Sequence, residues 1–118
     1  MISWRKLLVS PSNTLIEAIN ILHEGGCRIA LVVDQELKLL GTVTDGDIRR
    51  ALIDSVPMDS LVTLIMNKQP LIASSDMQEK EVLSLMGSKD LLHMPILDEH
   101  GILCDLVTLQ QLHKKSVY

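Results

Sequence analysis

Apolar residues near the start of the chain follow a helical period. An amphipathic helix is predicted by apolar residues at positions i, i+3, i+4 and i+7, which are Leu15, Ala18, Ile19 and Leu22. Thr14 and Glu17 have the spacing of a capping box at its start, and Gly25 with Gly26 ends it. This segment is therefore predicted to be a capped helix with one buried face.

Extended segments are predicted on both sides of this helix. Residues 29–33 form an unbroken apolar run, which is typical of a buried strand. The polar residues 34–38 are short enough for a hairpin, so residues 39–44 are predicted to form the next strand. A short strand over residues 7–9 and a second helix over residues 45–55 complete a β-α-β-β-α unit.

The same unit is repeated 64 residues further along the chain, without a gap. The shift superimposes Glu17 on Glu81, Asp34 on Asp98 and Thr44 on Thr108, together with the apolar pattern around them. The first strand of the second unit is predicted over residues 71–73. About 60 residues bury too little surface to be comfortably stable alone, so the two units are expected to share a core.

The repeat predicts a mixed α/β (α+β) fold with two β-α-β-β-α repeats packed about a pseudo-two-fold axis. We place the first repeat at residues 1–56 and the second at residues 57–118. Residues 56–70 join them, and their apolar spacing predicts an ordered linker helix.

Composition excludes several classes of function. The formal net charge of −4 argues against a duplex-binding surface, and Trp4 and Tyr118 are the only aromatic residues on which single-stranded bases could stack. No apolar run approaches the roughly 18 residues needed to cross a bilayer, and the start does not resemble a signal peptide. Cys27 and Cys104 form neither a disulfide framework nor a zinc motif. We therefore expect a cytoplasmic chain that binds neither nucleic acid nor membrane.

The most specific signal lies where the first repeat's last strand meets its last helix. Here stand a glycine, an apolar residue, a threonine, two free positions, an aspartate and an apolar residue: Gly41, Val43, Thr44, Asp47 and Ile48. This order resembles the motif of CBS domains. The second repeat has the Met-Pro-Ile-Leu-Asp sequence of that family at residues 94–98. From about residue 9 to residue 112, the chain resembles a tandem CBS pair, or Bateman module.

A narrower resemblance is found in the residues that open the chain. Residues 4–11, 29–34 and 41–50 together are similar to the CBS pair that stands N-terminal to sugar-nucleotidyltransferase domains. No catalytic domain follows in this sequence, so we favour its interpretation as part of a longer protein.

The family resemblance implies a cleft between the repeats that holds AMP, ADP or ATP, with Mg²⁺ possible beside ATP and no cofactor required. It implies ligand contacts from residues of the first repeat and of the segment entering the second: Arg28, Gly41, Val43, Thr44, Gly46, Asp47, Gln69, Pro70, Leu71 and Ile72. It implies a second, degenerate site at His93, Thr108 and Gln111. No metal site is expected.

Elementary chemistry supports a role for the first motif. The Asp47 carboxylate can accept two hydrogen bonds from a ribose 2′,3′-diol, and Thr44 can reach the same sugar or the α-phosphate. The helix start offers N–H groups and a positive dipole end to phosphate. Gly41 and Gly46 suit a close backbone approach or a sharp turn. Arg28 would face phosphate, or would be an exposed charge beside a strand.

A purely structural role for the same residues stays open. Thr44 and Asp47 are also spaced as a capping box. The second repeat has Thr108 followed by Gln111, which can still cap a helix but lacks the anionic diol acceptor, and Asp105 replaces the glycine. We therefore predict one competent site, and we expect Asp47→Ala to weaken nucleotide binding roughly ten- to a hundredfold while the fold survives.

These observations favour a non-catalytic, regulatory module. The sequence contains no phosphate loop and no nucleophile elbow. The module is expected to bind an adenine nucleotide, to form a homodimer and to control an attached or partner enzyme. The alternative is a CBS-pair scaffold with empty clefts that oligomerises through apolar residues of its last helices: Ile48, Leu52 and Leu112. The sequence leaves open which nucleotide binds and whether it activates or inhibits.

Overall fold

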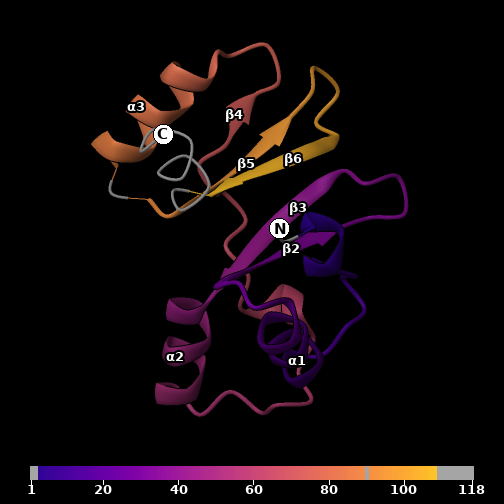
Figure 1. The fold of residues 1–118 in the computed structure, drawn as a ribbon. Helices are drawn as coiled ribbons and strands as arrows, with labels where there is room; N and C mark the ends of the chain where they lie inside the picture. Colours follow the sequence, from indigo (N-terminus) through magenta and orange to yellow (C-terminus); the bar gives the residue numbers. More distant parts are fainter. Residues whose placement is uncertain (1–2, 90, 109–118) are drawn as a thin grey trace. The chain divides into compact units, whose positions relative to one another are not determined.

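Each of the two units of the chain is built on a three-stranded sheet (Figure 1). The computed structural model describes residues 3–89 and 91–108, and the units are Met1–Pro70 and Leu71–Tyr118. The first unit contains, in order, η1 (Trp4–Leu7), β1 (Leu8–Val9), α1 (Leu15–Gly25), β2 (Ile29–Val33), β3 (Leu39–Thr44), α2 (Asp45–Ile53) and η2 (Val62–Leu64). The second contains β4 (Ala73–Ser74), α3 (Glu79–Ser88), β5 (His93–Leu97) and β6 (Leu103–Thr108).

The two sheets have the same strand order and the same register. β1 is parallel to β2 and β4 is parallel to β5, whereas the β2–β3 and β5–β6 pairs are antiparallel. Val9 is opposite Val32 in the first sheet, and the residues 64 positions later, Ala73 and Ile96, are opposite each other in the second. Each antiparallel ladder shifts register directly after Val32 or Ile96. The predicted repeat and the mixed α/β fold class are therefore confirmed. The packing of the repeats about a pseudo-two-fold axis stays a prediction.

The α1 helix forms as the apolar spacing predicts. The Thr14 hydroxyl accepts a hydrogen bond from the Glu17 N–H at 3.3 Å, and Glu17 Oε1 accepts one from the Thr14 N–H at 2.9 Å. Leu15, Ala18 and Leu22 are buried on one face, where the helix contributes to the core of the first sheet. Gly26 ends the helix with a left-handed φ of 64°.

The linker prediction was wrong, because residues 56–70 form only the single 3₁₀ turn η2. The carbonyls of Ser60 and Met58 accept hydrogen bonds from the N–H groups of Leu15 and Ile16, at 2.8 and 3.0 Å. These are the first amides of α1, which have no partner inside their own helix. A linker helix would direct the same carbonyls to itself. The linker side chain Val62 is fully buried in the first core, so the linker folds as part of the first unit.

The remaining strands and helices lie close to their predicted positions. Strands β2 and β3 have the predicted bounds, and β1 and α2 are one and two residues shorter than expected. Strand β4 starts at Ala73, two residues later than predicted. A parallel partner one step earlier would be opposite Pro95, which has no N–H to donate. Among the described residues, no helix is long and apolar enough to cross a membrane.

The second unit has a smaller core of its own. It is formed by buried side chains from each of its strands β4 and β5 and from α3: Ala73, Val82, Met86, Met94 and Ile96. The predicted counterpart of α2, and with it Gln111 and Leu112, lies outside the described residues.

Candidate functional site

The first CBS-like motif lies at the junction of β3 and α2, where Thr44 is the N-cap residue of the helix. The Thr44 hydroxyl accepts a hydrogen bond from the Asp47 N–H at 3.4 Å. Asp47 Oδ2 in turn accepts from the Thr44 N–H at 2.9 Å and from its hydroxyl at 3.0 Å. Asp47 is only 9% exposed. The capping role that the sequence left open is therefore present in the structure.

Each aspartate at the start of α2 faces an arginine. Arg50 lies one turn further along the helix and donates a hydrogen bond to Asp47 Oδ1. Arg28, directly before β2, places its Nε 3.9 Å from Asp45 Oδ2. The Arg28 and Asp45 side chains are 75% and 55% exposed, so solvent screens this ion pair and it contributes little to stability. Arg50 is 69% exposed but its partner Asp47 is buried, so only the arginine side of that pair is open to solvent.

The carboxylate of Asp47 is almost fully occupied in this arrangement. Of its roughly four acceptor positions, Thr44 uses two on Oδ2 and Arg50 uses one on Oδ1. A vicinal diol that binds Oδ1 would have to displace Arg50. The displaced arginine is mostly solvent-exposed and can be hydrated, and the diol hydroxyls would replace it as hydrogen-bond donors to the buried carboxylate.

The N-termini of α1 and α2 have equivalent capping boxes but different surroundings. In α1 the first two amides are bonded to linker carbonyls of Ser60 and Met58. In α2, no loop carbonyl or side chain within residues 3–89 and 91–108 accepts a hydrogen bond from the amides of Asp45 or Gly46. Of these two helix N-termini, that of α2 is therefore the one whose first amides can donate hydrogen bonds to a bound ligand.

The two glycines of the motif have different surroundings. A Cβ at Gly46 would meet Arg50 Nη1 and Thr44 Oγ1 at 3.7 Å, which is ordinary contact. A Cβ at Gly41 would lie 2.7 Å from the Asn67 carbonyl oxygen and 2.8 Å from Met66 Sδ. The close approach at Gly41 is therefore made by the linker of the chain itself.

The linker pairs with β3 beside this glycine. The Thr42 N–H donates to the Asn67 carbonyl at 3.0 Å, and the Asn67 N–H donates to the Thr42 carbonyl at 2.8 Å. Val43, the next motif residue, is fully buried in the first core. Gly41, Val43, Thr44, Gly46 and Asp47 are therefore brought together at one end of β3.

The segment that enters the second repeat lies largely at the surface. The Gln69 N–H donates to Asn67 Oδ1 at 3.0 Å, and Pro70 is half-buried. Leu71 and Ile72 precede β4 and are each 40% exposed, so neither is a core strand residue. Their apolar faces are open to contact.

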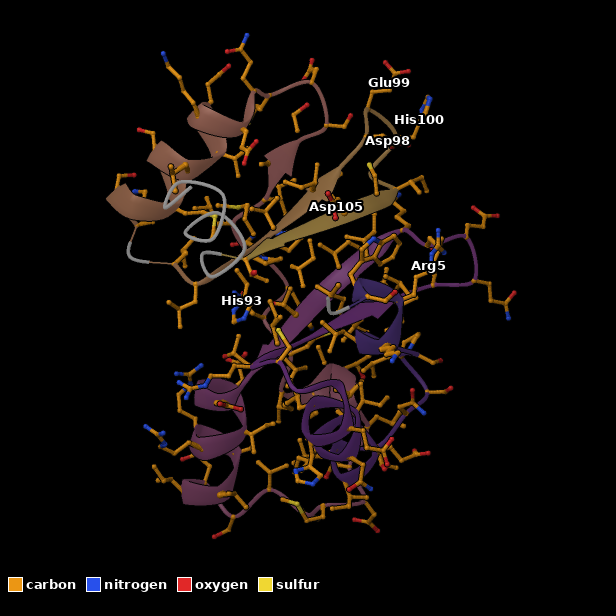
Figure 2. All side chains as sticks on the ribbon, in the orientation of Figure 1. Arg5, His93, Asp98, Glu99, His100 and Asp105 are labelled. Carbon is orange, nitrogen blue, oxygen red and sulfur yellow. The ribbon has the colours of Figure 1, made fainter. Side chains whose placement is uncertain are left out.

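The second motif differs from the first in its geometry as well as its sequence. His93 and Thr108 are opposite each other on β5 and β6, and Gln111 lies outside the described residues. Asp105, in the position equivalent to Gly41, is an exposed residue of β6 (Figure 2). Its Oδ1 accepts a hydrogen bond from the Leu106 N–H at 2.8 Å. Leu106 is equivalent to Thr42, whose N–H is bonded to the linker in the first unit.

Two residues near the first motif make contacts that the sequence did not predict. Arg50 could have been found from its i, i+3 spacing to Asp47, which places the two side chains on one helix face. Asn67 carries no local signal, because its significance depends on where the linker meets β3.

Comparison with known proteins identifies the family. The CBS domain model matches residues 2–54 and 62–117. The uncharacterised protein RP505 of Rickettsia prowazekii is 34% identical over 81% of this chain and 30% of its own length. Inosine-5′-monophosphate dehydrogenase of Methanocaldococcus jannaschii is 33% identical over 95% of this chain and 22% of its own length. The chain thus spans less than a third of each of these relatives.

Solved structures share the fold over nearly the whole chain. An uncharacterised conserved protein from Pyrococcus horikoshii has a TM-score of 0.82 and 27% identity, covering 99% of this chain and 89% of that protein. CBSX2 in complex with AMP has a TM-score of 0.80 and 21% identity, covering 93% and 86%. The cytosolic domain of the Mg²⁺ channel MgtE in complex with ATP has a TM-score of 0.76 and 24% identity, covering 92% and 44%. With two matched repeats and a shared fold, the chain belongs to the CBS domain family as a tandem CBS pair, a regulatory and non-catalytic module.

Proposed function

We propose that this chain binds an adenine nucleotide at its first CBS motif and controls an attached or partner enzyme. The observation that carries the proposal is the start of α2. There the capping box of Thr44 and Asp47 lies beside the backbone amides of Asp45 and Gly46, which donate no hydrogen bond to a linker carbonyl. The complexes of CBSX2 with AMP and of MgtE with ATP share this fold and support the choice of ligand.

Each residue of the site has a distinct role in this proposal. Asp47 accepts hydrogen bonds from the ribose diol once Arg50 has left Oδ1. Arg50 and Arg28, both exposed, then neutralise the phosphate charge beside the amides of α2. Leu71 and Ile72 offer apolar faces to the base. Where the nucleotide is ATP, Mg²⁺ accompanies its phosphates and needs no protein ligand, and no group of metal-binding side chains occurs in the described residues.

Regulation follows from thermodynamic linkage. A nucleotide that binds one conformation of the module better than another shifts the equilibrium of any domain coupled to it. A coupling free energy of about 1–3 kcal/mol changes activity or affinity 5- to 150-fold. The dehydrogenase of Methanocaldococcus jannaschii is one relative in which a similar segment is part of a named enzyme. A sugar-nucleotidyltransferase is the partner that the opening residues favour.

Calorimetric titration with AMP, ADP, ATP and GTP tests the proposal, with Asp47→Ala as the site variant. We expect one adenine-selective site per chain and an affinity roughly ten- to a hundredfold lower in the variant. Asp47→Ala also removes a helix cap, so it should lower the free energy of unfolding by about 0.5–2 kcal/mol.

Glu17→Ala is the matched control for this cap. Glu17 forms the same box on α1, with a 2.9 Å bond to the Thr14 N–H, but the amides of α1 are covered by the linker. The control should cost similar stability in urea unfolding and leave nucleotide affinity unchanged. Equal affinities of Asp47→Ala and wild type would contradict the site, and Asp47 would then be a cap only.

A second candidate function, oligomerisation, is favoured by exposed apolar side chains of the first unit. Leu52 and Ile53 at the end of α2 are 58% and 73% exposed, and Leu64 in the linker is 69% exposed. Such residues are typical of an interaction surface. Ile48, which the sequence placed on this surface, is instead partly buried against the first core, because it lies on the helix face that packs inward. A homodimer formed through Leu52 and Ile53 is compatible with nucleotide binding.

A further inference from the structure

We infer that Gly41 is a positioning residue, which acts on the bound base through the linker without touching the nucleotide; this inference rests on the proposed nucleotide function. Gly41 allows the linker to cross β3 at Asn67. The crossing fixes Gln69 and Pro70, where the segment proposed to hold the base begins. Gly41 would thereby set base selectivity.

The crossing is tight and is made by the backbone. A Cβ on Gly41 would lie 2.7 Å from the carbonyl oxygen of Asn67, a distance that real Cβ atoms essentially never show. The Met66 sulfur, at 2.8 Å, could rotate away, but the Asn67 carbonyl could not, because it accepts the 3.0 Å hydrogen bond from the Thr42 N–H. Any side chain at position 41 would therefore push the linker away from β3.

A short series of hydrogen bonds joins the two parts of the site. Thr42, two residues before the N-cap Thr44, exchanges both backbone hydrogen bonds with Asn67. The side chain of Asn67 then accepts a hydrogen bond from the Gln69 N–H at 3.0 Å. A displaced linker would lose the first pair and shift Gln69 relative to Thr44. Asn67 thus fixes the position of Gln69, where the proposed base segment starts, relative to Thr44 of the proposed ribose motif.

Direct contact between Gly41 and a nucleotide does not fit this geometry. Gly41 is buried, and the side of its Cα that would carry a side chain is covered by Met66 and Asn67. The second repeat provides the contrast. There Asp105 replaces the glycine, is exposed, and bonds the N–H of Leu106 that is equivalent to the linker-bound N–H of Thr42. At this position the first repeat thus has a glycine beside the linker, and the second has a side chain that bonds the next N–H itself.

The test compares the affinities of the full chain for AMP and GMP in three variants. Gly41→Ala should reduce the ratio of AMP affinity to GMP affinity at least fivefold, because the segment at Gln69 no longer presents a fixed base contact. Asn67→Ala should reduce the same ratio about twofold or more, since it removes only the acceptor for the Gln69 N–H. Gly87→Ala is the control, because a Cβ there meets nothing within 4 Å, and its ratio should equal that of wild type.

The selectivity ratio separates positioning from general destabilisation, since partial unfolding lowers both affinities by the same factor. Hydrogen exchange of the Thr42 and Asn67 amides should become faster in Gly41→Ala and stay unchanged in Gly87→Ala. An unchanged ratio in Gly41→Ala would overturn the inference, and so would an equal loss of both affinities. Asn67 is exposed, so Asn67→Ala decides the question if Gly41→Ala does not fold. If wild type binds neither AMP nor GMP, the same ratio is measured with ATP and GTP, and if wild type binds none of the four, the proposed function itself fails.

Discussion

Glu17 and Asp47 show how one residue-level interaction leads to different outcomes. Each carboxylate accepts the N–H of a threonine three residues earlier, at 2.9 Å in both cases. The hydrogen bonds from Thr14 lower the pKa of Glu17 below its ordinary value, as expected for a carboxylate stabilised in its charged form. Only Asp47 has an arginine on its second oxygen and open amides beside it. The neighbours of a capping residue therefore decide whether it can also bind a ligand.

Ser55 is a residue whose backbone conformation favours glycine. It follows α2 with a φ of 60°, and the N–H of Val56 donates to the carbonyl of Ala51 as in a Schellman motif. Ser55→Gly should therefore raise the free energy of unfolding by about 0.5–1 kcal/mol in urea titration. Ser84→Gly, inside the helix α3, should lower it by a similar amount. A loss of stability in Ser55→Gly would contradict this explanation.

Cys104 should react slowly although its residue is exposed. Partial burial raises the pKa of its thiol, and the nearby carboxylates of Asp98 and Asp105 raise the same pKa further by repelling the thiolate (Figure 2). We expect alkylation by iodoacetamide at pH 8 to be slower than that of free cysteine, measured by mass spectrometry in a Cys27→Ser background. Asp105→Asn should increase the rate. Equal rates with and without the carboxylate would show that Asp105 has no influence.

At the scale of elements, the linker determines how the first unit is completed. It supplies carbonyls to the first two amides of α1 and a backbone partner to Thr42 on β3. The linker therefore bonds the first amides of one helix and pairs with the edge strand of one sheet. Both contacts require an extended linker backbone. On β6, the side chain of Asp105 accepts the hydrogen bond from the N–H of Leu106 locally. The fully buried side chain of Val62 anchors the linker in the core, and the partly buried Ile65 and Met66 pack against the same core.

Val62→Ala should therefore destabilise the first unit. Val62 is fully buried, so removing two methyl groups should lower the free energy of unfolding by about 1–3 kcal/mol. Leu64→Ala, in the same 3₁₀ turn but 69% exposed, should change it by less than about 0.5 kcal/mol. The two midpoints in urea unfolding, measured side by side, check the difference. Equal midpoints would mean that the linker is not anchored through Val62.

At the scale of the whole molecule, two copies of one unit have diverged in sequence at the motif. The sheets keep the same register, but only the first repeat has the glycine and the aspartate of the motif. The second repeat carries Asp105 and Gln111 at the equivalent positions.

Self-association is the prediction that belongs to this scale. Ile53→Glu places a charge among the exposed apolar residues at the end of α2, so a dimer formed there should dissociate at least tenfold more readily in sedimentation velocity. Leu83→Glu, on the helix α3 of the second unit and 39% exposed, serves as the control and should leave the dimer intact. If wild type is a monomer at all concentrations tested, or if Ile53→Glu dimerises normally, the oligomerisation proposal fails.

Much of the fold was predictable because its signals are local. The capping box of α1, the apolar run of β2 and the length of the hairpin act within a few residues, and the repeat doubles each signal. The linker was predicted as a helix because its apolar spacing fits one. That prediction was wrong because the partners of its carbonyls, Leu15 and Ile16, lie more than 40 positions earlier in the sequence.

The sequence by itself determined the family, the two repeats and the position of the first motif, since these depend on periodicity and on residue order. Only the tertiary structure decided that Gly41 serves the crossing linker and that linker carbonyls bond the first amides of α1. It also decided that Ile48 faces the core while Ile53 faces solvent. The physical reason is that steric contact, ion pairing and burial depend on which distant segments meet, and local sequence does not encode that meeting.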